Sequence, residues 1–266
     1  MEVYVTNPLL RHVRIPSRKE RECVLRQAQD GRFEAGVGTT TDLEALKAAA
    51  ATRALQLVQP GMVIGLGTGS TVRYFIEGLA RLLESGMTAK GVPTSVATAE
   101  LAKSLALPIV DDLTAPIDLA VDGADEIDPD LRLIKGRGGA LTREKLVASA
   151  ARRFVVIADG SKLVGQLGRG VLPVEVIPFL WRRTAEQLEA LGASYALRGD
   201  PGQPFITDNG NLILDLTFAA GIEDPEVLDA QLNQTVGVVE HGLFIDLADT
   251  CIVADASGVR VLGSLG

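Results

Sequence analysis

From residue 61 onward, short apolar runs alternate with segments of helical periodicity. Runs typical of strands occupy residues 62–66, 89–92, 109–110, 117–121, 131–134 and 154–158, and helices are predicted over 70–84, 98–105 and 140–152. Such alternation is typical of a mainly parallel sheet with helices on its faces. The predicted fold class is therefore α/β, with a Rossmann-like sheet.

The pattern changes after Pro173. Runs typical of strands at 174–177, 194–197, 212–216 and 237–244 are mixed with helices predicted over 181–191 and 225–233. Asp208-Asn209-Gly210 has the composition of a hairpin turn. These features predict a smaller α+β unit.

Two final apolar runs, 251–254 and 259–262, are expected to return to the first sheet. We therefore expect a Rossmann-like catalytic domain over residues 41–171 plus 249–266. A lid or oligomerisation domain would occupy residues 172–248.

Residues 1–40 differ from the remainder, because they mix charged residues, Pro, Gly and Gln with little periodicity. The first clear helix follows at Thr41, where Thr41-x-x-Glu44 has the spacing of a capping box. We expect residues 1–40 to be a mostly disordered extension, and we infer no function from them.

Charge and composition exclude several classes of protein. The net charge of −8 argues against a nucleic-acid partner, because phosphate backbones are bound by basic surfaces. No apolar run reaches the roughly 20 residues that span a bilayer, so we expect no membrane partner. Two cysteines cannot build a disulfide framework and favour a reducing compartment. The expected location is the cytoplasm.

The two histidines, His12 and His241, lie in no recognisable motif. A His-rich metal site is therefore excluded, and a Ser-His-Asp triad is not favoured. Any catalysis must depend on carboxylates and lysines.

Four polar clusters directly follow predicted strands. They are Gly65–Thr71, Asp122–Glu126, Lys135–Gly139 and Ala158–Lys162. The carboxyl ends of parallel strands line one edge of an open sheet, where ligands bind. The sequence therefore predicts one shared site at this edge.

The glycine-rich loop contains Thr68, Gly69, Ser70 and Thr71 at the start of a predicted helix. Its G-x-G-x-G spacing, without a nearby acid for a ribose hydroxyl, differs from the dinucleotide fingerprint, and it lacks the P-loop lysine. Backbone amides and two hydroxyls suit a single phosphate group. An ordinary tight turn between strand and helix is the alternative.

The acidic cluster does not have the offsets of an EF-hand. Asp128 and Asp130, beside Pro129, are expected in a solvated acidic loop. Asp122 differs, because it ends a strand of buried type and precedes Gly123. Binding of a divalent metal remains an open alternative at this stage.

Four further residues have two interpretations each. Lys135 precedes glycines that would let a ligand approach the backbone, although it could be a surface lysine. Taken alone, Glu144 is expected to be a surface residue of a helix, and Lys162 could simply cap a loop. Lys47 lies at the border of a buried helix face, where lysines commonly extend to solvent. None of these four residues indicates a functional site by itself, and only their combination is specific.

Six segments together resemble ribose-5-phosphate isomerase, type A. They are G-L-G-T-G-S-T (65–71), V-D-G-A-D-E-I-D (121–128), K-G-R-G-G-A-L-T-R-E-K (135–145), I-A-D-G-S-K (157–162), L-P-V-E-V-I-P (172–178) and T-D-N-G-N (207–211). The resemblance covers about residues 42–262. It implies interconversion of ribose 5-phosphate and ribulose 5-phosphate in the pentose phosphate pathway.

The resemblance also implies roles for individual residues. Glu144 matches the base that moves a proton between C2 and C1, and Asp122, Asp125 and Lys135 match the catalytic polar groups around it. The implied substrate-binding positions are Lys47, Thr68, Gly69, Ser70, Thr71, Asp122, Gly123, Ala124, Asp125, Lys135, Gly136, Arg137, Gly138 and Lys162. No metal and no cofactor is implied, and a homodimer or homotetramer is expected.

Arg137 departs from the family pattern, which commonly has glycine there, so its direction is left open. Two rival functions share parts of the pattern. A related-fold enzyme, such as an amino-sugar-phosphate deaminase or a CoA transferase, would share the sheet, but a deaminase would be expected to use a histidine near the acids, and none is present there. A sugar-phosphate sensor would need the phosphate loop but not Lys135 together with Glu144.

Overall fold

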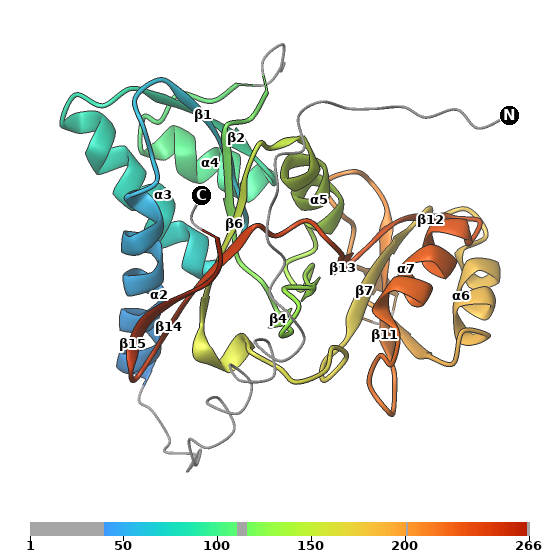
Figure 1. The fold of residues 1–266 in the computed structure, drawn as a ribbon. Helices are drawn as coiled ribbons and strands as arrows, with labels where there is room; N and C mark the ends of the chain where they lie inside the picture. Colours follow the sequence, from blue (N-terminus) through green and yellow to red (C-terminus); the bar gives the residue numbers. More distant parts are fainter. Residues whose placement is uncertain (1–39, 111–115, 201, 265–266) are drawn as a thin grey trace, which may run out of the picture. The chain divides into compact units, whose positions relative to one another are not determined.

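The computed structural model describes residues 40–110, 116–200 and 202–264 (Figure 1). The residues from Thr40 onward belong to one compact unit. Helix α2, the first in the described part of the chain, spans Thr40–Leu55, so it begins one residue before the predicted start. The expectation for the preceding extension, and the capping role of the Thr41 side chain, lie outside the described residues and side chains.

A six-stranded sheet forms the centre of the fold, in the order β15-β14-β6-β3-β1-β2. Its strands are β1 (Met62–Leu66), β2 (Ala89–Pro93), β3 (Leu119–Asp122), β6 (Phe154–Asp159), β14 (Thr250–Asp255) and β15 (Gly258–Gly263). All neighbours are parallel except β14 and β15, which form an antiparallel hairpin. The α/β class and the return of the last two strands to this sheet are confirmed.

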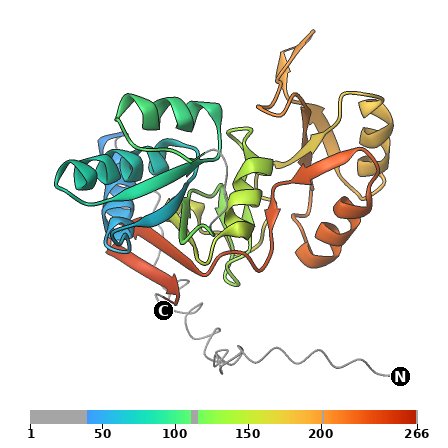
Figure 2. The same ribbon diagram turned by 90° about the horizontal axis from the view of Figure 1, so that it is seen from above.

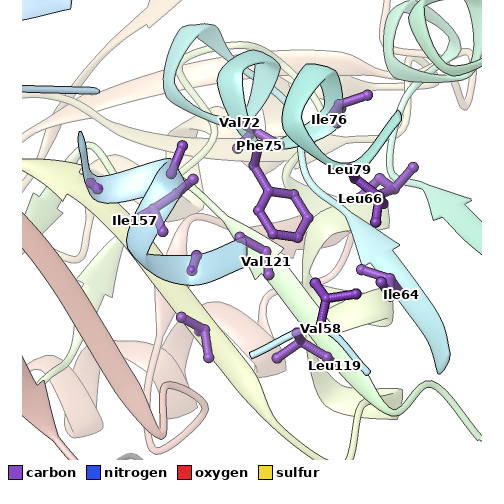
Figure 3. Packing of buried hydrophobic residues seen from close by; sticks show 14 of the residues in the cluster. Val58, Ile64, Leu66, Val72, Phe75, Ile76, Leu79, Leu119, Val121 and Ile157 are labelled. Carbon is purple, nitrogen blue, oxygen red and sulfur yellow. The ribbon is translucent and has the colours of Figure 1, made fainter. Parts of the chain in front are cut away.

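The central strands β3, β6 and β14 are buried on both faces, as parallel sheets require, whereas the edge strand β15 is largely exposed. Helices α2, α3 (Ser70–Glu84) and α4 (Val96–Ser104) share one apolar core with β1. Phe75 of α3 packs in this core among Ile64, Leu66 and Val121 (Figure 3). Successive residues of β6 face opposite cores. Val155 and Ile157 belong to this first core, whereas Val156 belongs to a second core that includes Ala148 of α5 (Leu141–Ala150).

The short strand β5 (Leu133–Ile134) corrects one prediction. The run at 131–134 was expected in the parallel sheet, but β5 pairs antiparallel with β4 (Glu126–Ile127) and β13 (Leu243–Phe244). Two consecutive strands that pair in parallel need a crossover of a dozen or more residues between them, whereas only the short turn of residues 128–132 connects β4 to β5. Leu131, at φ +63°, lies in that turn. The run at 109–110 forms only a single bridge, between Gly91 and Ile109.

A second, antiparallel sheet has the order β12-β7-β11-β8. Its elements are β7 (Leu172–Val176), α6 (Trp181–Glu189), β8 (Ser194–Leu197), β11 (Leu212–Thr217), α7 (Pro225–Gln234) and β12 (Val238–His241). The predicted turn at 208–210 precedes β11, although a small arm of β9 (Gly199–Asp200) and β10 (Gln203–Pro204) also lies in the connection from β8. The division into a catalytic and a lid domain stays a prediction.

The run predicted as one strand at 237–244 is split between two sheets. Gly242 separates β12 from β13, and a Cβ there would lie 2.3 Å from the Lys135 carbonyl oxygen. Helix α5 lies between the two parts of the fold, in contact with β3 on one side and with β7 and β12 on the other (Figure 2). Of the helices in the described ranges, none has the length and apolar character to cross a membrane.

Candidate active site

Asp122, Lys135 and Glu144 meet in a buried cluster. Asp122 is the last residue of β3, Lys135 directly follows β5, and Glu144 lies in the first turn of α5. Lys135 Nζ lies 3.1 Å from Asp122 Oδ2 and 3.2 Å from Glu144 Oε2, and it donates a 2.7 Å hydrogen bond to the Gly123 carbonyl. The three side chains are only 3–5 % exposed. Three of the four predicted catalytic residues therefore lie in direct contact.

Glu144 has the properties of a group that exchanges protons near neutral pH. Burial raises its pKa to about 8, helped by the charge of Asp122, while Lys135 opposes the change. Glu144 Oε2 is buried, and its 3.2 Å contact with Lys135 Nζ is an ion pair. A buried carboxylate with such a pKa can act as a general base and then as an acid.

Lys135 stays an ammonium group in this environment. Burial disfavours its charge, but the carboxylates of Asp122 and Glu144 outweigh that effect and raise its pKa. Its Nζ also lies 5.5 Å from the centre of the Phe244 ring, a distance suited to a cation–π contact. A fixed cation at this place can stabilise negative charge that develops on a substrate.

Asp122 joins the cluster to the glycine-rich loop. Burial raises its pKa, while Lys135 and the amides of Gly123 and Thr68, at 2.7 and 3.1 Å from Oδ1, oppose the change. The loop approaches closely because residue 67 is glycine: a Cβ there would lie 2.1 Å from Asp122 Oδ1. The contact depends on that missing side chain.

The loop ends at the N-terminus of α3. Gly69, the N-cap residue, has φ +130° and supplies no side-chain cap. Ser70 is exposed and Thr71 is half-buried, so the first amides and two hydroxyls of the helix are accessible. This arrangement suits an anion such as a phosphate group.

A group of hydroxyls behind this loop was missed by the sequence reasoning. Thr68 Oγ1 lies within hydrogen-bond distance of Thr94 Oγ1, Ser95 Oγ and Thr98 Oγ1, at 2.8, 2.8 and 3.1 Å. Thr98 also donates to the Gly67 carbonyl at 2.9 Å. The signal was available, because these residues follow β2 as the other polar clusters follow their strands, and Ser95 caps α4.

The direction of the Arg137 side chain is now visible. Its backbone amide donates to Asp125 Oδ2 at 3.0 Å, and its Nε lies 3.9 Å from Asp125 Oδ1. The guanidinium extends toward Gly170, where a Cβ would lie 2.2 Å from Nη2. Arg137 is half-exposed and holds Asp125 beside the cluster.

The neighbouring residues of this segment bring the two loops together. A Cβ at Gly138 would lie 3.8 Å from Thr68 Cγ2. Gly136 has φ +102°, which favours glycine at the turn after Lys135. Ala124 and Gly123 are half-buried between Asp122 and Asp125.

Two predicted binding lysines, Lys47 and Lys162, differ from each other in their contacts. Lys47 Nζ forms a 2.7 Å ion pair with Glu44, which also accepts a 2.6 Å hydrogen bond from Tyr74, one turn after Ser70. The side chain of Lys162, in the short 3₁₀ helix Gly160–Lys162, forms no hydrogen bond or ion pair with another described residue. Binding roles for both stay predictions.

The remaining acids are structural. Glu126 is buried and accepts hydrogen bonds from the amides of residues 168–170. The expectation of a solvated loop is wrong for Asp128, which is buried and accepts a 2.6 Å hydrogen bond from Arg132 Nε, whereas Asp130 is exposed. Within the part of the chain that the structure describes, no three His, Cys, Asp or Glu side chains are grouped to hold a metal ion.

Fold and site together define a class of protein. A Rossmann-like sheet presents, at one edge, a buried carboxylate that titrates near neutrality, an ammonium group beside it and an anion-binding helix terminus. These are the parts of an α/β enzyme that transfers protons on a small anionic substrate.

Comparison with known proteins identifies the family. The family model described as ribose 5-phosphate isomerase A (phosphoriboisomerase A) matches residues 90–258. Ribose-5-phosphate isomerase A of Chloroflexus aurantiacus is 52 % identical over 226 residues, covering 83 % of this chain and 94 % of the relative. That of Thermomicrobium roseum is 51 % identical over 223 residues, covering 82 % and 94 %. The chain therefore belongs to the ribose 5-phosphate isomerase A family.

Solved structures agree in fold. The Plasmodium falciparum ribose 5-phosphate isomerase has a TM-score of 0.81 at 39 % identity, covering 84 % of this chain and all of that chain. The Methanocaldococcus jannaschii isomerase A has a TM-score of 0.79 at 42 % identity, covering 83 % and 99 %. A D-ribose-5-phosphate isomerase in complex with phospho-erythronic acid has a TM-score of 0.80 at 44 % identity, covering 84 % and 99 %.

Proposed function

We propose that the cluster of Asp122, Lys135 and Glu144 is the active site of this isomerase. As a member of its family, the chain is an enzyme that interconverts D-ribose 5-phosphate and D-ribulose 5-phosphate in the non-oxidative pentose phosphate pathway. The observation that supports the assignment most strongly is the contact of the buried Glu144 carboxylate with the Lys135 ammonium group at 3.2 Å, and burial raises the pKa of that carboxylate.

Glu144 is the proposed proton carrier. Its ionised carboxylate removes the proton from C2 of the open-chain aldose and leaves an ene-diolate. The same group, now protonated, delivers a proton to C1 while a hydroxyl proton moves from O2 to O1. Because the pKa of Glu144 lies near neutrality, neither half of this exchange is strongly opposed.

Lys135, Asp122 and Asp125 are proposed to act on the sugar oxygens. The ammonium of Lys135 offsets the negative charge of the ene-diolate as it forms, in a site with little water. Asp122 holds Lys135 in place and can accept a hydrogen bond from a sugar hydroxyl. Asp125, linked to Arg137, is placed to do the same.

The phosphate group is proposed to bind at the start of α3. The amides and hydroxyls of Ser70 and Thr71 supply hydrogen bonds, and Gly69 lets the phosphate approach the backbone. Lys47 and Lys162 would add positive charge, and Lys47 would have to leave Glu44 to do so. Binding at this remote end would fix C1 and C2 against Glu144.

The first test is ketose formation from ribose 5-phosphate by the purified chain, with and without EDTA. We expect rapid turnover that EDTA does not change, and Glu144→Gln should lower kcat at least about 10³-fold with little change in substrate binding. Phospho-erythronic acid, bound in a solved relative, should inhibit competitively. Substantial activity of Glu144→Gln would contradict the role of Glu144, and restoration by Mg²⁺ or Mn²⁺ after EDTA would show a metal requirement.

We also propose that the enzyme works in the cytoplasm, without a cofactor, as a homodimer or homotetramer. Neither a nucleic acid nor a membrane is a proposed partner, in keeping with the net charge of −8. Light scattering of the purified chain measures the assembly, and a monomer would contradict this part of the proposal.

A further inference from the structure

A buried carboxylate outside the catalytic cluster organises one turn of the chain. Glu175, on β7, is fully buried and accepts four hydrogen bonds. The donors are Thr142 Oγ1 at 2.5 Å, Thr207 Oγ1 at 2.9 Å, Asn209 Nδ2 at 3.1 Å and Asn211 Nδ2 at 2.8 Å. Three of these donors belong to residues 207–211, which we name the bridging turn.

Glu175 forms no ion pair with any described Lys, Arg or His, so neutral donors alone hold its charge. A buried carboxylate needs such donors, because it has lost its hydration. Each donor is therefore held firmly. One of them, Thr142, lies in α5 two residues before Glu144, so the helix that carries the proposed base is tied to the bridging turn.

A second contact strengthens this tie. Arg143 Nε donates to Asn209 Oδ1 and its Nη2 donates to the Asp208 carbonyl, both at 2.8 Å. Consecutive residues of α5 thus bind Glu175, which holds the bridging turn, and the tip of the turn itself. The turn and the start of α5 form one connected unit.

The other side of the bridging turn reaches α4. Asp208 Oδ2 accepts a 2.7 Å hydrogen bond from the amide of Val96, the first residue of that helix. A carboxylate at a helix N-terminus is favourable, because the first amides lack helical partners. The next residues in this chain of contacts, Ser95 and Thr98, hold Thr68 of the glycine-rich loop.

We infer that Asp208 is a positioning residue of the isomerase, which fixes the separation between the glycine-rich loop and Glu144. The inference rests on the proposed function, because only a substrate that binds at both places is sensitive to their separation. The path runs from Glu144 through Thr142 and Glu175 to the bridging turn, and from Asp208 to α4. Small displacements of reacting groups lower rates strongly, so such a link should matter for turnover.

The test compares Asp208→Ala with Asp208→Asn. Alanine leaves the Val96 amide without its acceptor, whereas the asparagine carbonyl oxygen can still accept that hydrogen bond. We expect Asp208→Ala to lower kcat/KM for ribose 5-phosphate by about tenfold or more, and Asp208→Asn to stay within about threefold of the wild type. Asp130→Ala removes an exposed carboxylate elsewhere and is the matched control.

Inhibition constants distinguish a changed separation between the glycine-rich loop and Glu144 from damage to the glycine-rich loop itself. Phospho-erythronic acid, which carries both a phosphate and a carboxylate, should bind Asp208→Ala about tenfold more weakly, while inorganic phosphate should inhibit it as it inhibits the wild type. Equal weakening of both would overturn the inference, and so would unchanged kcat/KM in Asp208→Ala. Absent turnover in the wild type would instead refute the proposed function.

A second variant breaks the path at its other end. Thr142→Val keeps the shape of the side chain but removes its hydrogen bond to Glu175. It should show the same selective loss of affinity for phospho-erythronic acid. It also tests the inference should Asp208→Ala fail to fold, and wild-type kinetics in Thr142→Val would then overturn it.

Discussion

Replacing Glu144 by Gln should stabilise the folded chain above pH 5 while it abolishes turnover. In the fold, burial and the charge of Asp122 oppose ionisation of Glu144 and raise its pKa to about 8, from an ordinary value of 4.5. Gln has nearly the shape of the protonated acid but cannot ionise. The variant therefore avoids the free-energy cost of a buried negative charge.

The magnitude follows from linkage between protonation and folding. Between pH 4.5 and about 8 the folded wild type binds this proton more tightly than the unfolded chain does, so its stability falls as the pH rises through that interval. At about 1.4 kcal/mol for each pH unit, the advantage of the Glu144→Gln variant over the wild type is near zero below pH 4.5, about 3 kcal/mol at pH 7 and about 5 kcal/mol above pH 8.

The assay is urea unfolding followed by circular dichroism at pH 5, 7 and 9. Glu100→Gln is the matched control, because it removes an exposed carboxylate of α4 and should change the free energy of unfolding by less than about 0.5 kcal/mol at each pH. A stability difference that does not grow from pH 5 to pH 9 would refute the reasoning. So would a Glu144→Gln variant less stable than the wild type at pH 9.

Three further predictions concern the same cluster. The kcat/KM of the wild type should rise with pH to a plateau above about 8, because only ionised Glu144 accepts the proton; a midpoint below pH 6 in the pH–rate profile would contradict this. Lys135→Met should lower kcat at least about 10²-fold and move that midpoint upward, because Asp122 and Glu144 lose the cation between them; an unchanged profile would exclude the role of Lys135. Gly67→Ala should destabilise the fold by about 1–3 kcal/mol and lower activity, because its Cβ would meet Asp122 Oδ1 at 2.1 Å, as measured by thermal unfolding. Gly165→Ala is its control, since a Cβ there meets no atom within 4 Å, and equal effects of the two variants would contradict the steric argument.

Much of the fold and the site could be predicted because both depend on local patterns. Strand β1 and helix α3 have the predicted bounds, since a short apolar run and helical periodicity are properties of neighbouring residues. The rule that ligands bind at the carboxyl ends of parallel strands located Asp122. The same rule was applied to Lys135, but the strand before it, β5, belongs to an antiparallel sheet and not to the parallel one. That antiparallel sheet brings Lys135 to Asp122 all the same.

What the sequence by itself determined is most of the helices and longer strands, the α/β class and the residue types brought to one edge of the sheet. Only the tertiary structure decided how these groups affect one another. The pKa of Glu144 depends on burial and on Asp122, which lies 22 positions earlier in the chain, and the contact between Asp208 and Val96 joins residues 112 positions apart. Desolvation and charge interactions depend on distances in space, and a sequence pattern reports only distances along the chain.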